Sequence, residues 1–512
     1  MERRQFLRLA GAGAAVGSLG SLAACGGKKG GAAADSADLD TVTVMLPLYE
    51  TQAPSATGEM QQAIEKYLGK KLKITWVPNA SYDDKVNVTL ASDDVPELLA
   101  TGKTPNFVRS AQAGAFWDLT DKIDAYPELK PDNADTARNA SINGKTFGLY
   151  KSRDPIRSAT IVRKDWLDKL DLKMPKTTQD LYDIAKAFHT ERPNGKSKCS
   201  GLIIPKWPGG YGSASPFDVI EVWYGAPNKF GDRGGKLVPG FDTAEFFEAV
   251  DFIKKMISEG LVNPDFATLD SGSWNDPFFN GDGGIIIDVS SRGMQLQSLF
   301  KEKYPKDYGK YVDMSGNLTG PDGQLHAYPT TGYNGFIAIS KQSVPTESEL
   351  DDVLKVLAKL NAKKGQVLIN NGIEGKNFKV VDDYAVSIND KQKAAATVAE
   401  DVKSFAQLGM AVSGYKAYSA KPAGKPEQKL DAERLKFHAS DLKHAVQDPT
   451  LPYVSETYAS KGAQLDQIVG DGLLKYLAGD ITMSKFKSEL RRWHKSGGDQ
   501  VIKELNELYQ KG

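Results

Sequence analysis

Residues 162–188 read VRKDWLDKLDLKMPKTTQDLYDIAKAF and combine several local signals in one short stretch. A β-branched run that ends at Val162 predicts a strand, and Asp165–Leu170 predicts a short helix. The residue before Pro175 avoids the α region, so an extended connection follows. Residues 177–180 form a capping-box pattern, and apolar residues spaced i, i+3, i+4 and i+7 come after it. Local rules therefore predict a strand, a short helix, a turn and a longer amphipathic helix.

The chain before this stretch alternates strands with helices. Thr41–Leu46 and Lys71–Trp76 are β-branched strands, and the segment between them carries a helical apolar stripe. Such alternation predicts βαβ units and a mainly parallel sheet. Because ligands of these sheets sit beyond the carboxyl ends of the strands, the loops of interest are Pro47–Gly58, which contains Tyr49, and Leu99–Lys103.

Length and charge narrow the class of protein. A chain of 512 residues is too long for one core and fits two domains with tails. Lys and Arg number 65, as do Asp and Glu, so no basic footprint predicts a nucleic-acid partner. Phe, Tyr and Trp make up 9% of residues, and several lie in Gly/Pro/Ser-rich loops. Flat aromatic faces outside a core suit carbohydrate binding, although large proteins also hold such residues in loops.

The N-terminus carries an export signal. A basic start (residues 1–8) precedes an uncharged Gly- and Ala-rich run, which together predict a signal peptide over residues 1–24. The run ends Leu22-Ala-Ala-Cys25, which matches the bacterial lipobox and implies lipidation of Cys25. Residues 25–40 are then a lipidated flexible tether. Arg3-Arg4-Gln5-Phe6-Leu7 also resembles a twin-arginine signal, and the choice between the general and the twin-arginine export route stays undecided.

The amino-acid sequences of several segments resemble those of a known family. Residues 162–188 resemble the entry to the second lobe of extracellular solute-binding proteins of sugar ABC importers, in particular the large lipoprotein subgroup whose studied members bind oligosaccharides. Leu90–Leu98, Phe116–Pro127 and Asn143–Tyr150 resemble further segments of that family. The resemblance implies an α/β fold of the type II periplasmic-binding-protein-like class, with two α/β lobes, a multi-crossing hinge and a ligand cleft between the lobes.

The family pattern also sets domain boundaries. It implies a first lobe of residues 41–151 plus 318–375 and a second lobe of residues 152–317 plus 376–512, the latter with a helical C-terminal tail. The crossings are expected at Lys151–Pro155, near Leu318 and at Gly372–Phe378.

Aromatic residues of the predicted loops are candidates for stacking on sugar rings. Of the adjacent Trp223 and Tyr224, at most one is expected to face the cleft. The alternative for Trp207 is a place in the core of its own lobe. The aromatic candidates are Tyr49, Trp207, Tyr211, Trp223, Trp274, Tyr328 and Tyr333.

Polar candidates complete the predicted site. By position after the strand Gly284–Asp288, the resemblance implies that Ser290, Ser291 and Arg292 contact ligand, and a guanidinium can bind hydroxyls or a uronate carboxylate in pairs. The alternatives are a salt bridge of Arg292 to Asp288 and a surface pair of Arg153 with Asp154. Basic candidates hint at an acidic sugar, although neutral-sugar sites also use them. The polar candidates are Lys103, Arg153, Ser290, Ser291 and Arg292.

No cofactor or metal is predicted. The loop His189–Gly201 corresponds to a calcium site in many relatives, but it offers one carboxylate, Glu191, and Asn194, whereas calcium takes six to eight oxygen ligands. The family calcium loop is therefore expected to be lost here. Cys199 has no His or second Cys at ligand or catalytic spacing and is interpreted as a bystander thiol.

The sequence favours binding over catalysis. The five histidines show no metal-ligand spacing, and no catalytic motif occurs in the mature chain, so no enzyme is predicted. We expect a monomeric, exported protein, lipid-anchored to the outer face of the bacterial cytoplasmic membrane, that captures an oligosaccharide by lobe closure and delivers it to ABC permease subunits. The alternatives are a surface sugar sensor for a membrane signalling protein and a surface glycan-active enzyme, whose carboxylate pair a sequence cannot reveal.

Overall fold

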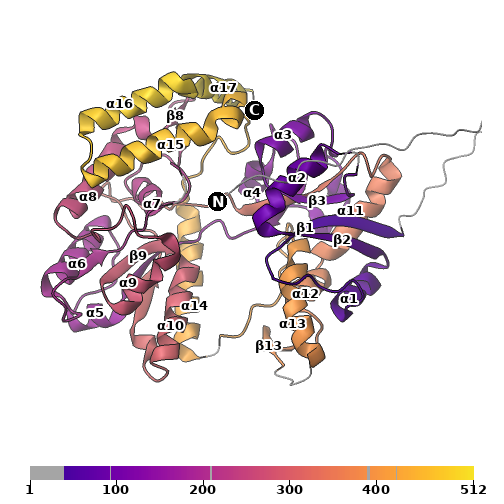
Figure 1. The fold of residues 1–512 in the computed structure, drawn as a ribbon, viewed down its shortest axis with the longest axis horizontal. Helices are drawn as coiled ribbons and strands as arrows, with labels where there is room; N and C mark the ends of the chain where they lie inside the picture. Colours follow the sequence, from indigo (N-terminus) through magenta and orange to yellow (C-terminus); the bar gives the residue numbers. More distant parts are fainter. Residues whose placement is uncertain (1–39, 93, 208–209, 389–392, 423, 512) are drawn as a thin grey trace, which may run out of the picture. The chain divides into compact units, whose positions relative to one another are not determined.

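The computed structural model describes residues 40–92, 94–207, 210–388, 393–422 and 424–511. The predicted signal peptide, Cys25 and almost all of the tether lie outside the described residues. Helices and strands form two separate sheet-centred cores, which confirms the α/β class (Figure 1). Among the helices that the structure describes, none combines the length and apolar character needed to cross a bilayer.

The first core is built on a five-stranded sheet of order β2-β1-β3-β11-β4. β1 pairs in parallel with β2 and β3, and β11 pairs antiparallel with β3 and β4. The strands predicted at residues 41–46 and 71–76 are confirmed as β1 and β2. The strand bounds are β1 Thr41–Leu48, β2 Lys71–Pro78, β3 Leu98–Thr101, β4 Leu149–Ser152 and β11 Tyr333–Ile339.

Helices from distant parts of the sequence bury their apolar faces in this first core. Val42, Phe107, Leu354 and Phe405 belong to one buried cluster, which continues to Val412. The helices α1, α11 and α12 contact one another, and α13 contacts α1 and α12 (Figure 1). The helix bounds are α1 Glu59–Leu68, α2 Tyr82–Leu90, α3 Pro105–Gln112, α4 Ala134–Ala140, α11 Glu347–Asn361, α12 Lys363–Asn371 and α13 Lys393–Phe405, and the hairpin β12 Phe378–Val381 and β13 Tyr384–Ser387 precedes α13.

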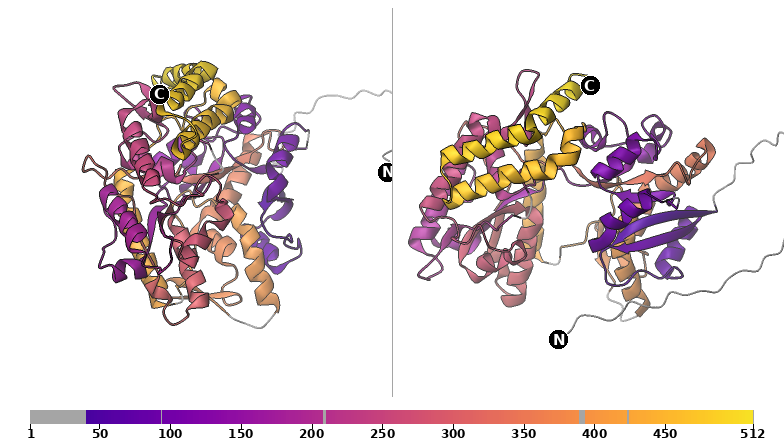
Figure 2. Two further views of the ribbon diagram at one scale, coloured as in Figure 1. Left: turned by 60° about the vertical axis from the view of Figure 1, so that its left-hand side comes forward. Right: turned by 45° about the horizontal axis from the view of Figure 1, so that its top comes forward.

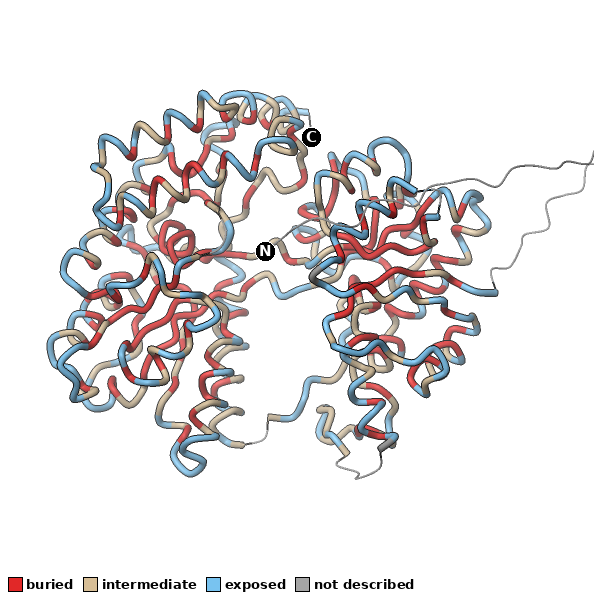
Figure 3. The backbone as a smooth tube through the Cα atoms, viewed as in Figure 1, coloured by how far each residue is buried: buried red, intermediate tan, exposed pale blue. Residues whose placement is uncertain are grey.

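The second core surrounds a four-stranded sheet of order β10-β5-β9-β6 that is buried on both faces (Figure 3). Side chains alternate between faces along a strand, so Ile285 and Ile287 join one buried cluster and Ile286 joins another. Gly284 has no side chain because a Cβ there would lie 2.3 Å from the ring of Phe188. The strand bounds are β5 Ser158–Arg163, β6 Ser200–Leu202, β9 Gly283–Val289 and β10 Val312–Ser315, with a separate hairpin of β7 Phe230–Asp232 and β8 Leu237–Pro239.

Helices cover both faces of the second sheet. The stretch 162–188 folds as predicted, with a capping box of Thr177 and Asp180 at the start of α6. Helices α15 and α16 lie side by side and close one face (Figure 2). On that face lie α5 Lys164–Lys169, α6 Thr178–Glu191, α7 Pro216–Trp223, α8 Ala244–Ser258, α15 Glu456–Ala478, α16 Met483–Trp493 and α17 Asp499–Tyr509. On the other lie α9 Asn275–Asn280, α10 Ser290–Lys303 and α14 Lys425–Asp441.

The chain passes between the cores at positions that differ in part from the expected boundaries. The first crossing, residues 153–157, joins β4 to β5. Leu318 and Tyr328 still pack in the second core, so the second crossing is residues 329–332 rather than 318. The chain then stays in the first core until Val412, and the third crossing follows it rather than lying at 372–378. The reason is that the apolar stripe of α13 packs beside α1 and α12, which assigns residues 376–412 to the first core.

Candidate ligand-binding site

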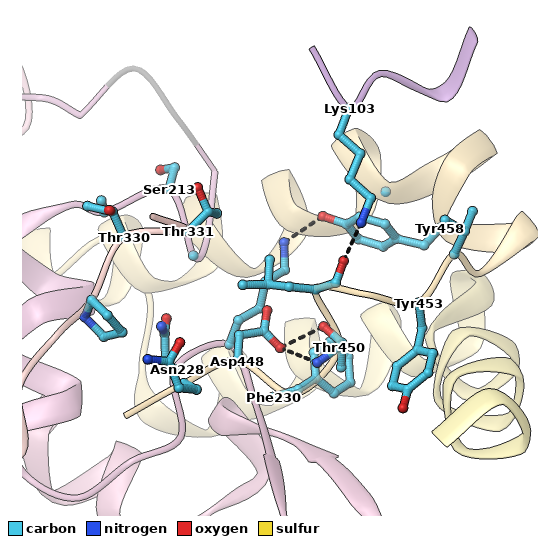
Figure 4. A pocket seen from close by; sticks show the side chains of 18 of the residues that line it. Lys103, Ser213, Asn228, Phe230, Thr330, Thr331, Asp448, Thr450, Tyr453 and Tyr458 are labelled. Carbon is cyan, nitrogen blue, oxygen red and sulfur yellow. Dashed lines mark hydrogen bonds between the residues drawn. The ribbon is translucent and has the colours of Figure 1, made fainter. Parts of the chain in front are cut away.

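A cavity of about 750 Å³ is lined by residues of the first two crossings and of a segment near the C-terminus. Its size is that of a small-molecule or oligomeric ligand site. Figure 4 shows Thr330 and Thr331 on the left, Asp448 and Thr450 near the centre, and Lys103, Tyr453 and Tyr458 on the right. The cavity therefore draws on loops that are far apart in the sequence.

Lys103 lies between β3 and α3, and its ammonium group is saturated by the chain's own carbonyl groups. Its Nζ donates to the carbonyl oxygens of Asn139 at 3.2 Å, Ser141 at 2.5 Å and Leu451 at 2.5 Å. Burial lowers the pKa of Lys103 to about 7. Because an ammonium group has three donors, none remains for a ligand in this arrangement. Lys103 lines the cavity but acts as a clamp on residues 447–454.

Residues 447–454, here called the clamp segment, touch both cores. Tyr453 packs against the second core, whereas the adjacent Val454 packs against the first. The backbone N–H of Asn143 also donates to the carbonyl of Pro452 at 2.8 Å. Alternating contacts of this kind hold the segment across the cavity.

Asp448 shapes the turn of the clamp segment. Its Oδ1 accepts hydrogen bonds from the backbone N–H of Thr450 at 2.8 Å and from the Thr450 hydroxyl at 2.6 Å, the pattern of an Asx turn. Burial raises the pKa of Asp448 to about 6, although the bonds from Thr450 lower it. The carboxylate is thus committed to the local backbone and orients the Leu451 carbonyl toward Lys103.

A second lysine of the cavity is also committed to protein groups. Lys229 donates to the hydroxyl of Tyr458 at 2.5 Å and to Asp466 at 2.9 Å. Burial would lower the pKa of Lys229, but the negative charge of Asp466 outweighs it and the pKa is raised. Burial also raises the pKa of Tyr458 to about 12. These contacts fix the loop after α7 to the start of α15.

Four of the residues predicted from sequence line the cavity: Lys103, Arg153, Tyr328 and Tyr333. Tyr328 and Tyr333 flank the second crossing, and Arg153 lies in the first. The two crossings are hydrogen-bonded to one another, because Arg153 N–H donates to Gly332 at 2.8 Å and Thr330 N–H donates to Pro155 at 2.7 Å. The structure therefore places one basic candidate, Arg153, and two aromatic candidates, Tyr328 and Tyr333, on the wall of the same cavity.

Three predicted aromatic residues are core residues instead, which corrects their assignment as ligand contacts. Trp223 is fully buried and donates to Asn317 at 2.8 Å. Trp274 is buried and donates to the carbonyl of Ile203 at 3.1 Å. Tyr211 is buried with ring contacts to phenylalanines of the second core. Each fills space in the core around the second sheet, and none of the three lines the cavity.

Two further aromatic candidates lie outside the lining of the cavity. Tyr49 is 59% exposed after β1. Trp207 packs edge-on against Trp274, with ring centroids 6.1 Å apart, which agrees with its alternative place beside the core. Its indole N–H donates at 2.9 Å to Ser213, which does line the cavity. Trp207 therefore contacts a residue of the cavity wall without lining the cavity itself.

Of the three polar residues predicted to contact ligand after β9, Ser290 and Arg292 bind other residues of the protein. Ser290 is buried with its hydroxyl 3.1 Å from Nε2 of His438, and Ser291 is exposed on α10. Arg292 forms the salt bridge to Asp288 that the sequence left as the alternative, and it donates to Asn275 at 2.7 Å. None of these three serine and arginine side chains lines the cavity.

Sequence reasoning missed several residues that do line the cavity. Arg157 was overlooked because it lies beyond the predicted crossing, and the clamp segment was assigned to a helical tail. The residues Asp448-Pro-Thr-Leu-Pro-Tyr453 carry a turn signal with two prolines, which marks a loop within that tail. The missed residues are Arg157, Phe230, Thr330, Asp448, Tyr453 and Tyr458.

The loop 189–201 makes contacts of its own. Asn194 donates to the carbonyls of Lys198 at 3.0 Å and Gly281 at 2.9 Å, and Lys196 pairs with Asp282 at 2.5 Å. Within the described part of the chain, no three His, Cys, Asp or Glu side chains cluster as a metal site would require. The lack of calcium stays a prediction.

Residues 50–366 match the family described as bacterial extracellular solute-binding protein. The chain belongs to this family. It is 39% identical over 478 residues to the lipoprotein LipO of Bacillus subtilis, covering 93% of each chain. It is 30% identical over 503 residues to the polygalacturonan/rhamnogalacturonan-binding protein YtcQ of the same species, covering 96% of each.

Solved structures show the same fold at low sequence identity. An extracellular solute-binding protein from Bifidobacterium longum subsp. infantis matches with a TM-score of 0.70 and 18% identity, covering 92% of this chain and 98% of that one. The alginate-binding protein AlgQ2 matches with a TM-score of 0.63 and 16% identity, covering 93% and 99%. The type II periplasmic-binding-protein-like fold expected from the sequence is therefore confirmed.

Proposed function

We propose that this protein is the lipid-anchored substrate-binding component of an ABC importer and that its cargo is an oligosaccharide. The observation that carries the proposal is the cavity, whose wall combines aromatic rings with hydroxyl and guanidinium groups. Such rings can cover sugar C–H surfaces while the polar groups bind hydroxyls. The aromatic lining residues are Phe230, Tyr328, Tyr333, Tyr453 and Tyr458.

The relatives support the same cargo class. YtcQ is named for binding polygalacturonan and rhamnogalacturonan, and a further relative, FusA of Streptococcus pneumoniae, is named as a fructooligosaccharide ABC transporter substrate-binding protein. Delivery to permease subunits and anchoring through Cys25 extend this likeness to the present chain. Ligand capture would bend the hydrogen-bonded first and second crossings together, because they join the two cores.

We propose binding without turnover. Glycoside hydrolysis uses two carboxyl groups on either side of the scissile bond. Among the cavity-lining residues that the structure describes, Asp448 alone carries a carboxylate, and that group is bonded to Thr450.

Thermal unfolding with a panel of neutral and acidic oligosaccharides tests the proposal. The sample is the full chain carrying Cys25→Ser, which removes the predicted lipid acceptor. A ligand at 100 times its dissociation constant adds about 2.7 kcal/mol to the free energy of unfolding, so a bound glycan raises the midpoint visibly. Chromatography of the same samples checks that the glycan is returned intact. No stabilisation by any glycan, or release of products, would overturn the proposal.

A further inference from the structure

Four cationic side chains line the cavity, and they fall into two kinds: Lys103, Lys229, Arg153 and Arg157. The lysines are held by protein oxygens: Lys103 uses three donors on carbonyl groups, and Lys229 donates to Tyr458 and forms an ion pair with Asp466. The two arginine side chains differ. Among the described residues, neither guanidinium has a hydrogen-bond or ion-pair partner, and both border the cavity.

The carboxylates close to these arginines are held by other groups. Asp154 accepts a hydrogen bond from Nδ1 of His438 at 2.7 Å and another from the backbone N–H of Ile156 at 3.1 Å. Asp288 pairs with Arg292. Both carboxylates reach Arg157 only through the longer-range attraction that favours its charged form. The donors of Arg153 and Arg157 therefore stay available.

The two guanidinium groups also repel one another. Burial lowers the pKa of Arg157 first, and the positive charge of Arg153 lowers it further. The chain as a whole has a formal net charge of zero, so no general field draws anions to it. An anion that meets both groups relieves the repulsion and fills donors that are otherwise unused.

We propose that Arg153 and Arg157 form a carboxylate-binding subsite and that the cargo is an acidic, uronate-containing oligosaccharide. This inference rests on the proposed function, of which it specifies the cargo. A guanidinium presents parallel N–H donors that match the two oxygens of a carboxylate, which a hydroxyl cannot do. Tyr333, which follows the second crossing, is only partly buried on the same cavity and would cover the sugar ring.

Isothermal titration calorimetry of the Cys25→Ser chain with tri-galacturonate and with its methyl ester tests the subsite. The two ligands share the ring and differ in charge. We expect the acid to bind at least tenfold more tightly than the ester and to weaken as salt is raised, because screening acts on the charge. Two further ligands are titrated. A sulfated disaccharide tests whether the site takes a sulfate instead of a carboxylate, and an oligomannuronate tests whether it takes a uronate other than galacturonate.

Substitutions locate the effect. Arg153→Gln and Arg157→Gln should each weaken tri-galacturonate or oligomannuronate binding at least tenfold while leaving the methyl ester within twofold. Arg157→Lys keeps the charge but not the fork, and it should weaken binding by less. Arg109→Gln, at an exposed position on α3, is the matched control and should change nothing. Circular dichroism of each variant identifies any that fail to fold, and the remaining arginine variant then carries the test.

The outcomes separate the inference from the function on which it rests. Tight binding of a neutral oligosaccharide that neither arginine variant changes would overturn the acidic cargo and keep the oligosaccharide-binding function. Binding of the sulfated disaccharide alone would overturn the carboxylate. Failure of every glycan to bind would overturn both.

Discussion

The clamp segment and the first crossing line the same cavity, but the polar groups of the clamp segment are hydrogen-bonded within the protein, whereas the guanidinium groups of the first crossing are not, among the residues that the structure describes. In the clamp segment, the Leu451 carbonyl meets Lys103 and the Asp448 carboxylate meets Thr450. In the first crossing, Arg153 and Arg157 keep their guanidinium donors unused among the described residues. Satisfied groups stabilise the wall, whereas unsatisfied groups carry binding energy for a ligand. Substitutions in the two regions should therefore affect stability and binding in opposite proportions.

The largest loss of stability is expected for Lys103→Met. The change leaves three carbonyl oxygens without their donor, so the free energy of unfolding should fall by about 3 kcal/mol at pH 6, below the pKa of about 7 at which Lys103 loses its proton. Denaturation by urea measures it, with Lys85→Met at an exposed position on α2 as the control. A loss no larger than that of the control would show that the clamp contributes nothing.

The next effect is a pH dependence caused by Asp448. Its folded pKa of about 6 lies above the ordinary value of 3.8, so its contribution is fully present below about pH 4 and is lost as pH rises through 6. Relative to Asp448→Asn, the native chain should lose on the order of 2 kcal/mol across this window. Urea denaturation of both proteins at half-unit steps of pH measures the difference, and parallel curves would contradict the assigned shift.

Tyr458→Phe should cost less. The substitution removes one hydroxyl, which bonds both Lys229 and Asp466, but leaves the Lys229–Asp466 ion pair in place. We expect a loss of about 1 kcal/mol in the free energy of unfolding. Tyr415→Phe, at an exposed tyrosine, is the control. A loss of several kcal/mol would mean that the ion pair depends on the hydroxyl for its geometry.

The smallest change in stability is expected for Arg157→Gln, although its effect on ligand binding is large. Because the guanidinium has no protein partner among the described residues, the free energy of unfolding of the ligand-free chain should change by less than about 0.5 kcal/mol. Urea denaturation without ligand measures it. A loss comparable with that of Lys103→Met would place Arg157 with the structural groups and remove the contrast between the two regions.

Local signals in the sequence predicted local structure well. The capping box at Thr177 and the apolar stripe after it gave α6, and the β-branched runs gave β1 and β2. The two-lobed fold was predicted from the resemblance of several segments to a known family rather than from these local signals. The predicted boundaries at residues 318 and 376 differ from those of the structure. Tyr328 packs in the second core and α13 in the first, and their packing partners are remote in sequence.

The site was predicted only in part, for a related reason. Tyr328, Tyr333 and Arg153 line the cavity, and their contact with a ligand stays a prediction. Trp223 and Trp274 are buried in the second core. Arg292 and Arg153 look alike in sequence, since each lies close to an aspartate. Only the structure shows that Asp288 pairs with Arg292, while Asp154 pairs with His438 and leaves Arg153 available.

The composition of the first core has a consequence for the order of events during synthesis. Val42 and Val412 belong to one buried cluster, and Lys103 bonds a carbonyl that lies 348 residues further along the chain. Contacts of such long range form late, because the ribosome releases the chain from its N-terminus onward. The first core therefore closes only after most of the polypeptide exists. Until β11 is made, β3 is unpaired on one side and β4 has no partner strand. Chaperones that shield those strands would act on this half of the molecule. The sheet of the second core lies between residues 158 and 315 and forms from a shorter piece of chain, although the helices that cover it extend to Tyr509.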